Sequence, residues 1–285
     1  MNDQIAPEID SVEAWSGKSR SDENFPVGSL LLARSVRPHM HAYYGFARNA
    51  DDIADSTELR PDEKVARLDV MEDVLLGRRV DGSPSTGRLR ESLRQTGVDA
   101  VHATDLLIAF RQDATKTRYE TFQELLDYCR YSAVPVGRYV LDLHGESSET
   151  HAASDALCTS LQILNHLQDC AADLRTLDRC YIPQALMREC GFSETDLLLA
   201  AETPSLRRGF NLLLERVSEL NSAAVALPHR VRNRRLRAET MFICRLALRL
   251  TDRLGKADPL ATRVALTKTD AASSLLRALG VLVWR

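Results

Sequence analysis

A stripe of polar side chains runs along residues 38–56, a helix-forming segment whose other side chains are mostly apolar. The stripe contains Tyr44, Arg48, Asp51 and Asp55, spaced by four, three and four residues. Side chains at these spacings share one face of an α-helix, and Asp52 lies at the edge of that face. A helix that is apolar on most sides is buried, so the polar stripe is predicted to face an internal cavity or cleft.

A second stripe of the same kind lies within residues 154–174, which are also largely apolar. It contains Gln162, Asn165, Asp169 and Asp173, spaced by three, four and four residues. If the two helices face each other, four carboxylates enclose a small space and repel one another. Mg²⁺ would relieve that repulsion, because it accepts oxygen ligands from carboxylates and from substrate phosphates. The stripes therefore predict a Mg²⁺ and diphosphate site, unless the aspartates form salt bridges on a solvated face.

Helical periodicity dominates the chain, and no run of alternating polar and apolar residues indicates a strand. Besides the two striped segments, helices are expected over residues 62–76, 88–96, 100–113, 119–145, 205–226, 229–254 and 262–279. Pro135 should kink the 119–145 segment, and residues 77–87 have the composition of a loop. The prediction is one all-α domain over residues 23–285, a helical bundle with a central cavity, preceded by loosely ordered residues 1–22.

Composition excludes several classes of protein. The net charge of −3 provides no basic footprint for general nucleic-acid binding. No run of 18 apolar residues is present to span a bilayer. The polar, acidic start MNDQIAPEIDSVEAW differs from a secretory signal. The expectation is a cytoplasmic protein without a nucleic-acid partner.

Diphosphate that is held by several cations is a good leaving group. Its departure from an allylic or cyclopropylcarbinyl carbon leaves a carbocation, which requires a dry pocket with aromatic ring faces. The chain offers Phe25, Tyr44, Phe46, Tyr128, Tyr131 and Phe210 as candidates for that lining. Core packing is the simpler interpretation of Phe46 and Phe210.

The segments YYGFARNADDIAD, YETFQELLDYCRYSAVPVG and LNHLQDCAADLRTLDRCYIP together resemble the squalene and phytoene synthase family, over about residues 23 to 275. The resemblance implies the class I isoprenoid synthase helical fold, Mg²⁺ and a C15 or C30 prenyl diphosphate. It implies two or three Mg²⁺ ions on Asp51, Asp55, Asn165, Asp169 and Asp173. It assigns diphosphate or substrate binding to Phe25, Arg48, Gln162 and Gly137, where the isoprenoid chain would pass close to the backbone. It directs Tyr44 and Tyr128 toward the reacting cation.

Within this family, the opening ENFPVGSLLL resembles the hydroxysqualene synthases of bacterial hopanoid biosynthesis. Such enzymes ionise presqualene diphosphate, rearrange the cation and quench it with water. Two departures from head-to-head synthases favour this subgroup. Asp22, Glu23 and Asn24 replace a serine-rich segment before Phe25, and Gln168 replaces an arginine. Both changes remove groups that would hold a second diphosphate, so one C30 substrate is expected instead of two C15 substrates.

Several alternatives stay open. The main one is a head-to-head synthase that makes presqualene diphosphate, squalene or phytoene, and either water or hydride could end the reaction. No GxGxxG fingerprint is present, so NADPH is not expected, although members of the family bind it without that motif. A class I terpene cyclase is disfavoured because residues 160–175 lack its second-helix glutamate pattern. The loop before RCYIP is one residue longer than usual, which leaves the roles of Arg179 and Tyr181 undetermined.

The basic run HRVRNRRLR, residues 229–237, has two interpretations. It is either a solvated helix face or a site of attraction to anionic lipid, worth about 1 kcal/mol for each basic residue near the surface. Because C30 substrates and products partition into membranes, a peripheral contact at the inner face of the membrane is expected. The residues concerned are Arg232, Arg234, Arg235 and Arg237.

Overall fold

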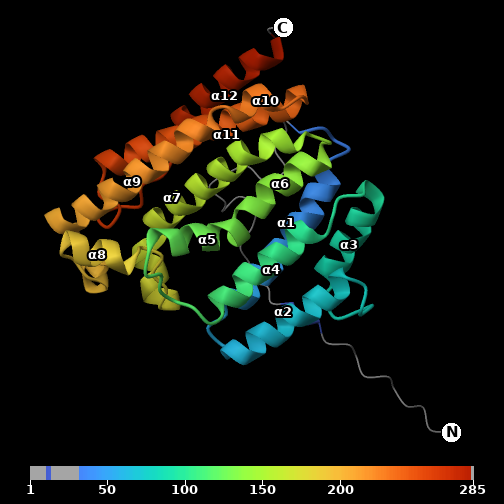
Figure 1. Ribbon diagram of the computed structural model, residues 1–285, viewed down its shortest axis with the longest axis horizontal. Coiled ribbons are helices and arrows are strands. Elements are labelled where there is room, and N and C mark those ends of the chain that lie inside the picture. Colours follow the sequence, from blue (N-terminus) through green and yellow to red (C-terminus); the bar gives the residue numbers. More distant parts are fainter. Residues whose placement is uncertain (1–10, 14–31, 284–285) are drawn as a thin grey trace.

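The computed structural model describes residues 11–13 and 32–283, and it confirms the all-α prediction (Figure 1). In chain order the elements are α1 (Arg37–Asp55), α2 (Pro61–Leu75), α3 (Pro84–Thr96), α4 (Val101–Asp113), α5 (Phe122–Ser132), α6 (Val134–Leu143), η2 (Ser148–Thr150), α7 (His151–Leu177), α8 (Gln184–Cys190), η3 (Glu194–Leu198), α9 (Pro204–Ala224), α10 (Leu227–Arg230), α11 (Arg234–Lys256) and α12 (Lys268–Val283). Within these residues, pairing of the β type is limited to an isolated parallel bridge between Arg118 and Cys180. Most of residues 1–22, expected to be loosely ordered, lie outside the described part.

Capping side chains explain where several helices begin. Asn233 accepts hydrogen bonds from two backbone N–H groups of the first turn of α11, which satisfies donors that a helix start leaves unpaired. The predicted helix over 229–254 is therefore divided into α10 and α11. Ser83 caps α3, and Pro84 occupies its first turn, so α3 begins earlier than the predicted residue 88. The predicted start of the last helix at 262 is also wrong, because α12 begins at Lys268.

The kink predicted at Pro135 is a break between α5 and α6. Ala133 leaves helical geometry with φ of −124° and ψ of −45°, and Pro135 lies in the first turn of α6, where proline is tolerated. Two residues later, Gly137 faces α7. A Cβ atom at Gly137 would lie 2.5 Å from Ser154 Oγ and 2.6 Å from Cys158 Sγ. The glycine therefore allows α6 and α7 to pack closely.

The helices form two groups around one extended hydrophobic core. In the first group, α1 packs against α2, α3 and α4; in the second, α7 packs against α5, α6, α9 and α11 (Figure 1). Phe46 and Ile53 of α1 have no exposed surface, so the apolar sides of this helix are buried, as its pattern predicted. Helix α12 covers α11 at the outer edge. No helix of the described chain has both the length and the apolar character needed to cross a bilayer.

Candidate active site

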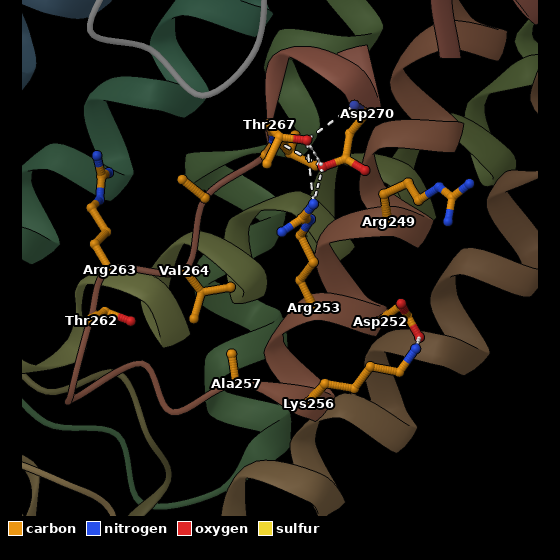
Figure 2. Close-up of a pocket in the computed structure, with 12 residues that line it drawn as sticks. Arg249, Asp252, Arg253, Lys256, Ala257, Thr262, Arg263, Val264, Thr267 and Asp270 are labelled. Atoms are coloured by element: carbon orange, nitrogen blue, oxygen red, sulfur yellow. Dashed lines mark hydrogen bonds and ion pairs between the residues drawn. The ribbon is translucent and has the colours of Figure 1, made fainter. Parts of the chain in front are cut away.

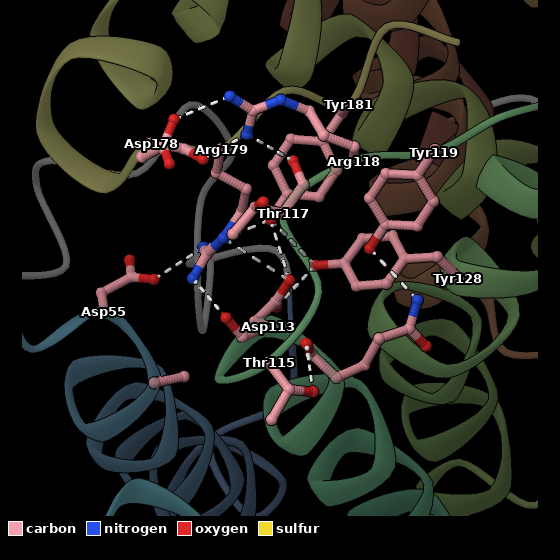
Figure 3. A network of polar contacts seen from close by, with 12 residues as sticks. Asp55, Asp113, Thr115, Thr117, Arg118, Tyr119, Tyr128, Asp178, Arg179 and Tyr181 are labelled. Atoms are coloured by element: carbon pink, nitrogen blue, oxygen red, sulfur yellow. Dashed lines mark hydrogen bonds and ion pairs between the residues drawn. The ribbon is translucent and has the colours of Figure 1, made fainter. Parts of the chain in front are cut away.

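The C-terminal ends of α1, α4 and α7 meet around the buried side chain of Arg179 (Figure 3). Its Nη1 donates to Asp55 Oδ1 at 2.8 Å, and its Nη2 donates to the backbone oxygen of Asp113 at 3.0 Å. Asp55 is the last residue of α1, and Asp113 is the last residue of α4. Because helix C-termini carry partial negative charge, the guanidinium neutralises both the carboxylates and the helix ends beside them.

The turn that follows α7 places Arg179 in this position. Asp178 adopts a left-handed conformation with φ of 49° and ends the helix. Arg118 holds the turn through ion pairs with Asp178 at 2.7 Å and with Glu194 at 2.5 Å. Cys180, just beyond, forms the isolated bridge with Arg118. The longer loop seen in the sequence therefore does not remove Arg179 from the site.

Asp113 is buried, and two tyrosines hydrogen-bond to its carboxylate. Tyr128 donates to Oδ2 at 2.8 Å, and Tyr181 donates to Oδ1 at 3.0 Å. Burial raises the pKa of Asp113 to about 6, although Arg179 and the Tyr128 hydroxyl act in the opposite direction. Burial also holds the pKa of each of these tyrosines well above the usual range, so both remain donors. The sequence pattern did not predict Asp113; its only signal is a charged residue that closes the apolar run DLLIAFRQD.

Four aromatic rings surround this polar group. The ring centroids of Tyr119, Tyr128 and Tyr181 lie 5.3 to 5.5 Å from one another. His166 of α7 stacks on Tyr181 with the centroids 3.6 Å apart, and its centroid is 6.0 Å from that of Tyr128. The cluster offers the ring faces that a carbocation requires. Of its members, only Tyr128 was assigned to the site from the sequence.

The other predicted aromatic residues lie elsewhere. Phe46 and Phe210 are buried in the hydrophobic core, which is the simpler interpretation that the sequence offered. Tyr131 is half-buried and packs against that core. Tyr44 is half-buried on α1, about 16 Å along the helix axis from Asp55. Phe25 lies outside the described residues, as do Asp22, Glu23 and Asn24, so the structure does not test their predicted roles.

On α1, Arg48 pairs with both carboxylates of the Asp-Asp motif. Its Nη1 lies 3.0 Å from Asp51 Oδ2, and its Nη2 lies 2.6 Å from Asp52 Oδ1. Asp52, at the edge of the predicted stripe, is the more deeply buried of the two. Burial raises the pKa of Asp51 to about 8, and the carboxylate of Asp55 adds to the rise. One guanidinium therefore does not balance the negative charge on this helix.

The stripe on α7 reaches the same end of the molecule. Burial raises the pKa of Asp173 to about 7, and the carboxylates of Asp169 and Asp55 contribute further. Because Asp55 belongs to α1, the two acidic stripes lie close enough to interact electrostatically. Asn165, one turn before Asp169, and Gln162, two turns before it, are half-buried on the same helix.

The loop between α11 and α12 supplies a cation that the sequence pattern did not indicate. Arg263 Nε lies 3.2 Å from Asp169 Oδ1. The neighbouring Gln168 is buried and donates to the backbone oxygen of Val264 at 2.5 Å. These adjacent contacts hold the loop against α7. Gln168, which stands where the resemblance led us to expect an arginine, thus serves to fix the segment that carries Arg263.

Among the described residues of this region, carboxylates outnumber cations. The carboxylates are those of Asp51, Asp52, Asp55, Asp113, Asp169 and Asp173, and the cations are Arg48, Lys64, Arg179 and Arg263. The excess negative charge favours a further cation, and carboxylate oxygens suit Mg²⁺. Among the described residues, no three acidic, histidine or cysteine side chains are already arranged to hold a metal ion. The donor set fits Mg²⁺ in its chemistry, while arginines pair with several of the carboxylates in this structure.

A cavity of about 560 Å³, which shares Arg263 with the acidic region, lies between the end of α11 and the loop that leads to α12 (Figure 2). Its charged lining consists of Arg249, Asp252, Arg253, Lys256, Arg263 and Asp270. Arg253 pairs with Asp270 at 2.7 Å, and Lys256 pairs with Asp252 at 2.6 Å. This polar pocket differs from the apolar central cavity expected from the sequence, which stays a prediction.

Comparison with known proteins gives consistent matches. Residues 18–270 match the family model described as squalene/phytoene synthase. The hydroxysqualene synthase of Rhodopseudomonas palustris is 45% identical over 254 residues, which cover 89% of this chain and 87% of that protein. That of Sinorhizobium fredii is 43% identical, with coverage of 86% and 84%.

Solved structures agree with this result. A squalene synthase from Alicyclobacillus acidocaldarius has a TM-score of 0.71 at 32% identity, and the alignment covers 82% of this chain and 88% of that one. A dehydrosqualene synthase shares the fold with a TM-score of 0.76 at 18% identity, over 92% of each chain.

Proposed function

Because this chain belongs to the squalene/phytoene synthase family, we propose that it converts presqualene diphosphate and water into hydroxysqualene and diphosphate, with Mg²⁺. The class I isoprenoid synthase fold and the enzymatic role in isoprenoid biosynthesis follow from that membership. The observation that carries the specific proposal is an acidic cluster at three helix ends, directly beside four aromatic rings. Two relatives named hydroxysqualene synthase, matched over most of the chain, support the same choice.

The acidic cluster is the proposed diphosphate end of the site. Asp51, Asp55, Asp169 and Asp173 would hold Mg²⁺ with the help of Asn165. Bound there, Mg²⁺ supplies charge neutralisation and Lewis-acid assistance to the departing diphosphate. Arg48 and Arg179 lie among these carboxylates, and a guanidinium binds phosphate oxygens with two parallel hydrogen bonds. These arginines are therefore the side chains proposed to orient the leaving group.

The aromatic cluster is the proposed cation end. When the carbon–oxygen bond breaks, the electron pair leaves with diphosphate and the C30 chain carries the positive charge. The faces of Tyr128, Tyr181 and Tyr119 stabilise that charge. Their close packing and burial exclude stray water during the rearrangement. As part of this proposal, Tyr44 retains its predicted role of facing the reacting cation, and Gln162 retains its predicted role in substrate binding.

The substrate distinguishes the proposed function from its alternative, a head-to-head synthase that joins two C15 diphosphates. Purified protein with Mg²⁺ is incubated with farnesyl diphosphate alone or with presqualene diphosphate alone, in water enriched in ¹⁸O. We expect no C30 product from the first mixture, and ¹⁸O-labelled hydroxysqualene from the second. Addition of EDTA should stop the second reaction. A C30 product from farnesyl diphosphate, or an unlabelled hydrocarbon formed with NADPH, would overturn the proposal.

We further propose contact with anionic lipid, although on a different surface from the basic run at 229–237. Part of that run forms hydrogen bonds within the protein. The backbone N–H groups of Arg232 and Asn233 donate to Glu146, and Arg237 Nε donates to Val231 O. These contacts fix the connection between α10 and α11. Of the four arginines assigned to lipid contact from the sequence, Arg237 thus has one nitrogen engaged by the backbone, while Arg232, Arg234 and Arg235 are exposed residues.

The outer face of α11 and α12 is better suited to lipid. Arg245, Arg249 and Arg277 lie close together, and burial together with the two neighbouring guanidinium groups lowers the pKa of Arg245. Within the described chain, no ion pair joins this trio to an acidic group, and Figure 2 shows Arg249 directed away from the Arg253–Asp270 pair. Leu248 and Leu276, which are 45% and 72% exposed, directly precede Arg249 and Arg277 in the sequence. Unpaired arginines next to exposed leucines match an anionic bilayer surface.

A further inference from the structure

The imidazole of His166 combines burial with an unmet hydrogen-bonding capacity. The residue is 8% exposed, and its Nε2 atom is buried without a hydrogen-bond partner. The ring stacks on Tyr181 and belongs to the aromatic cluster. A buried polar atom that lacks a partner leaves the cost of its desolvation uncompensated. An apolar side chain of similar shape would avoid that cost, so packing alone does not account for a histidine here.

The position of His166 on α7 relates the two halves of the site. It follows Asn165 and lies one turn before Asp169, on the helix that carries the second acidic stripe. Its ring turns toward Tyr181 and Tyr128, the two phenols that hydrogen-bond to Asp113. The unpartnered nitrogen therefore belongs to a ring at the junction of the proposed diphosphate end and the proposed cation end.

We propose that Nε2 of His166 accepts a hydrogen bond from the water molecule that ends the reaction, and so directs the product toward an alcohol. This inference rests on the proposed conversion of presqualene diphosphate. With one O–H group held by the imidazole, a lone pair of the water oxygen forms the new carbon–oxygen bond to the carbocation. The other O–H bond then breaks, and its proton passes to the released diphosphate, so no oxidant or reductant is needed.

Without a positioned water, the same cation has a competing fate. A carbon next to the charge loses a proton to diphosphate, and a carbon–carbon double bond forms in place of the alcohol. The ratio of C30 alcohol to C30 alkene therefore reports on the position of the water. A purely structural role for His166 would change stability or the total rate, and it would leave this ratio unaltered.

The test compares wild-type protein with His166→Phe, which keeps an aromatic ring on Tyr181 and removes both ring nitrogens. With presqualene diphosphate and Mg²⁺, we expect the alcohol-to-alkene ratio to fall about tenfold, as for the loss of one hydrogen bond that acts on one of two competing steps. His166→Asn retains hydrogen-bonding groups and should recover part of the alcohol. If the phenylalanine variant does not fold, His166→Leu and His166→Asn provide the same comparison.

A matched control lies on the same helix. His151 Nε2 is also buried without a hydrogen-bond partner, although Asp142 Oδ1 lies 3.7 Å away. This residue is about 22 Å from His166 along α7. His151→Leu should leave the product ratio unchanged. A wild-type ratio in His166→Phe, at normal or reduced turnover, would overturn the inference while the proposed function stands. Failure of the wild-type protein to convert presqualene diphosphate would instead overturn the proposed function, and this inference with it.

Discussion

Replacing Arg179 with methionine should destabilise the protein in a way that depends on pH. Methionine has a similar length and carries no charge, so the variant retains much of the packing and loses the cation beside Asp55 and Asp113. Removing one partner of a buried ion pair costs about 3–5 kcal/mol, because the remaining charge is left uncompensated. Asp55 is 28% exposed in its side chain, whereas Asp113 is only 6% exposed. Most of the cost therefore comes from Asp113.

The dependence on pH follows from the pKa of Asp113. Burial raises this pKa to about 6 even with Arg179 present, which is above the value of about 3.9 for an unfolded aspartate. The folded protein consequently binds this proton more tightly than the unfolded chain, and its stability declines as pH rises from about 4 toward 6. Without Arg179 the folded-state pKa rises further, so the decline continues to higher pH in the variant.

The difference between the two proteins is the quantity to measure. Over the pH interval in which Asp113 is protonated in the folded variant but not in the folded wild-type protein, the free energy of unfolding of the variant falls by an additional amount of about 1.4 kcal/mol for each pH unit. Urea unfolding followed by circular dichroism, without Mg²⁺, gives the free energy of unfolding of both proteins at pH 5.5, 7 and 8.5. The titration of Asp51 occurs in both proteins and largely cancels in the difference, whereas Asp173, whose pKa Arg179 lowers, adds to the extra loss in the variant.

A second variant isolates the cause. Arg179→Met combined with Asp113→Asn replaces the buried carboxyl with a neutral amide, and the extra loss of stability at high pH should shrink to the smaller part that Asp173 contributes. The double variant should also be more stable at pH 8.5 than Arg179→Met alone. An equal destabilisation by Arg179→Met at pH 5.5 and pH 8.5 would show that packing, and not the charge of Asp113, determines the role of the arginine.

Three further predictions concern other charges. Asp51→Asn should raise the thermal midpoint of the metal-free protein, because it removes a carboxylate whose pKa is raised first by burial and then by repulsion from Asp55. It should also abolish turnover, and a lower midpoint would contradict the first part. Arg263→Ala removes an exposed ion pair with Asp169 and should lower the free energy of unfolding in urea by at most about 1 kcal/mol. Calorimetry without substrate should show that the variant binds Mg²⁺ more tightly, and unchanged or weaker binding would count against competition between Arg263 and Mg²⁺ for Asp169. Replacing Arg245, Arg249 and Arg277 with glutamine should reduce sedimentation of the protein with phosphatidylglycerol vesicles and leave its weak binding to phosphatidylcholine vesicles unchanged. Glutamine at Arg234 and Arg235 should reduce that sedimentation less, and the opposite order would return the lipid contact to the 229–237 run.

Helix positions were largely predictable, because apolar periodicity and capping residues are local properties of a sequence. The boundaries that were wrong depend on single residues with two possible uses. Asn233 interrupts a continuous amphipathic pattern only because its side chain caps the following turn. Pro135 is compatible both with a kink inside a helix and with the first turn of a new helix. The dihedral angles of Ala133 show that a new helix begins here.

The sequence pattern failed to predict most of the cationic side chains of the site, and the reason is physical. Aspartates on α1 and α7 recur at helical spacing, so their common face is visible in the sequence. Arg179 and Arg263 come from turns and loops, and only tertiary structure brings them to Asp55 and Asp169. Asp113 and His166 belong to helices, but neither is part of a repeated polar spacing. A spacing pattern therefore finds groups that repeat along one helix and misses single residues brought together from several elements.

This asymmetry also bears on how strongly an acidic cluster indicates a metal. From the sequence, four facing carboxylates seemed to require divalent cations to avoid repulsion. The structure shows that arginines balance part of that charge, since Arg48 and Arg179 make contacts at 2.6 to 3.0 Å. What still points to a further cation is the excess of carboxylates over these arginines, since repulsion between carboxylates adds to the effect of burial in raising the pKa values of Asp51 and Asp173. The case for Mg²⁺ therefore rests on the excess of carboxylates over guanidinium groups, and not on the acidic motifs alone.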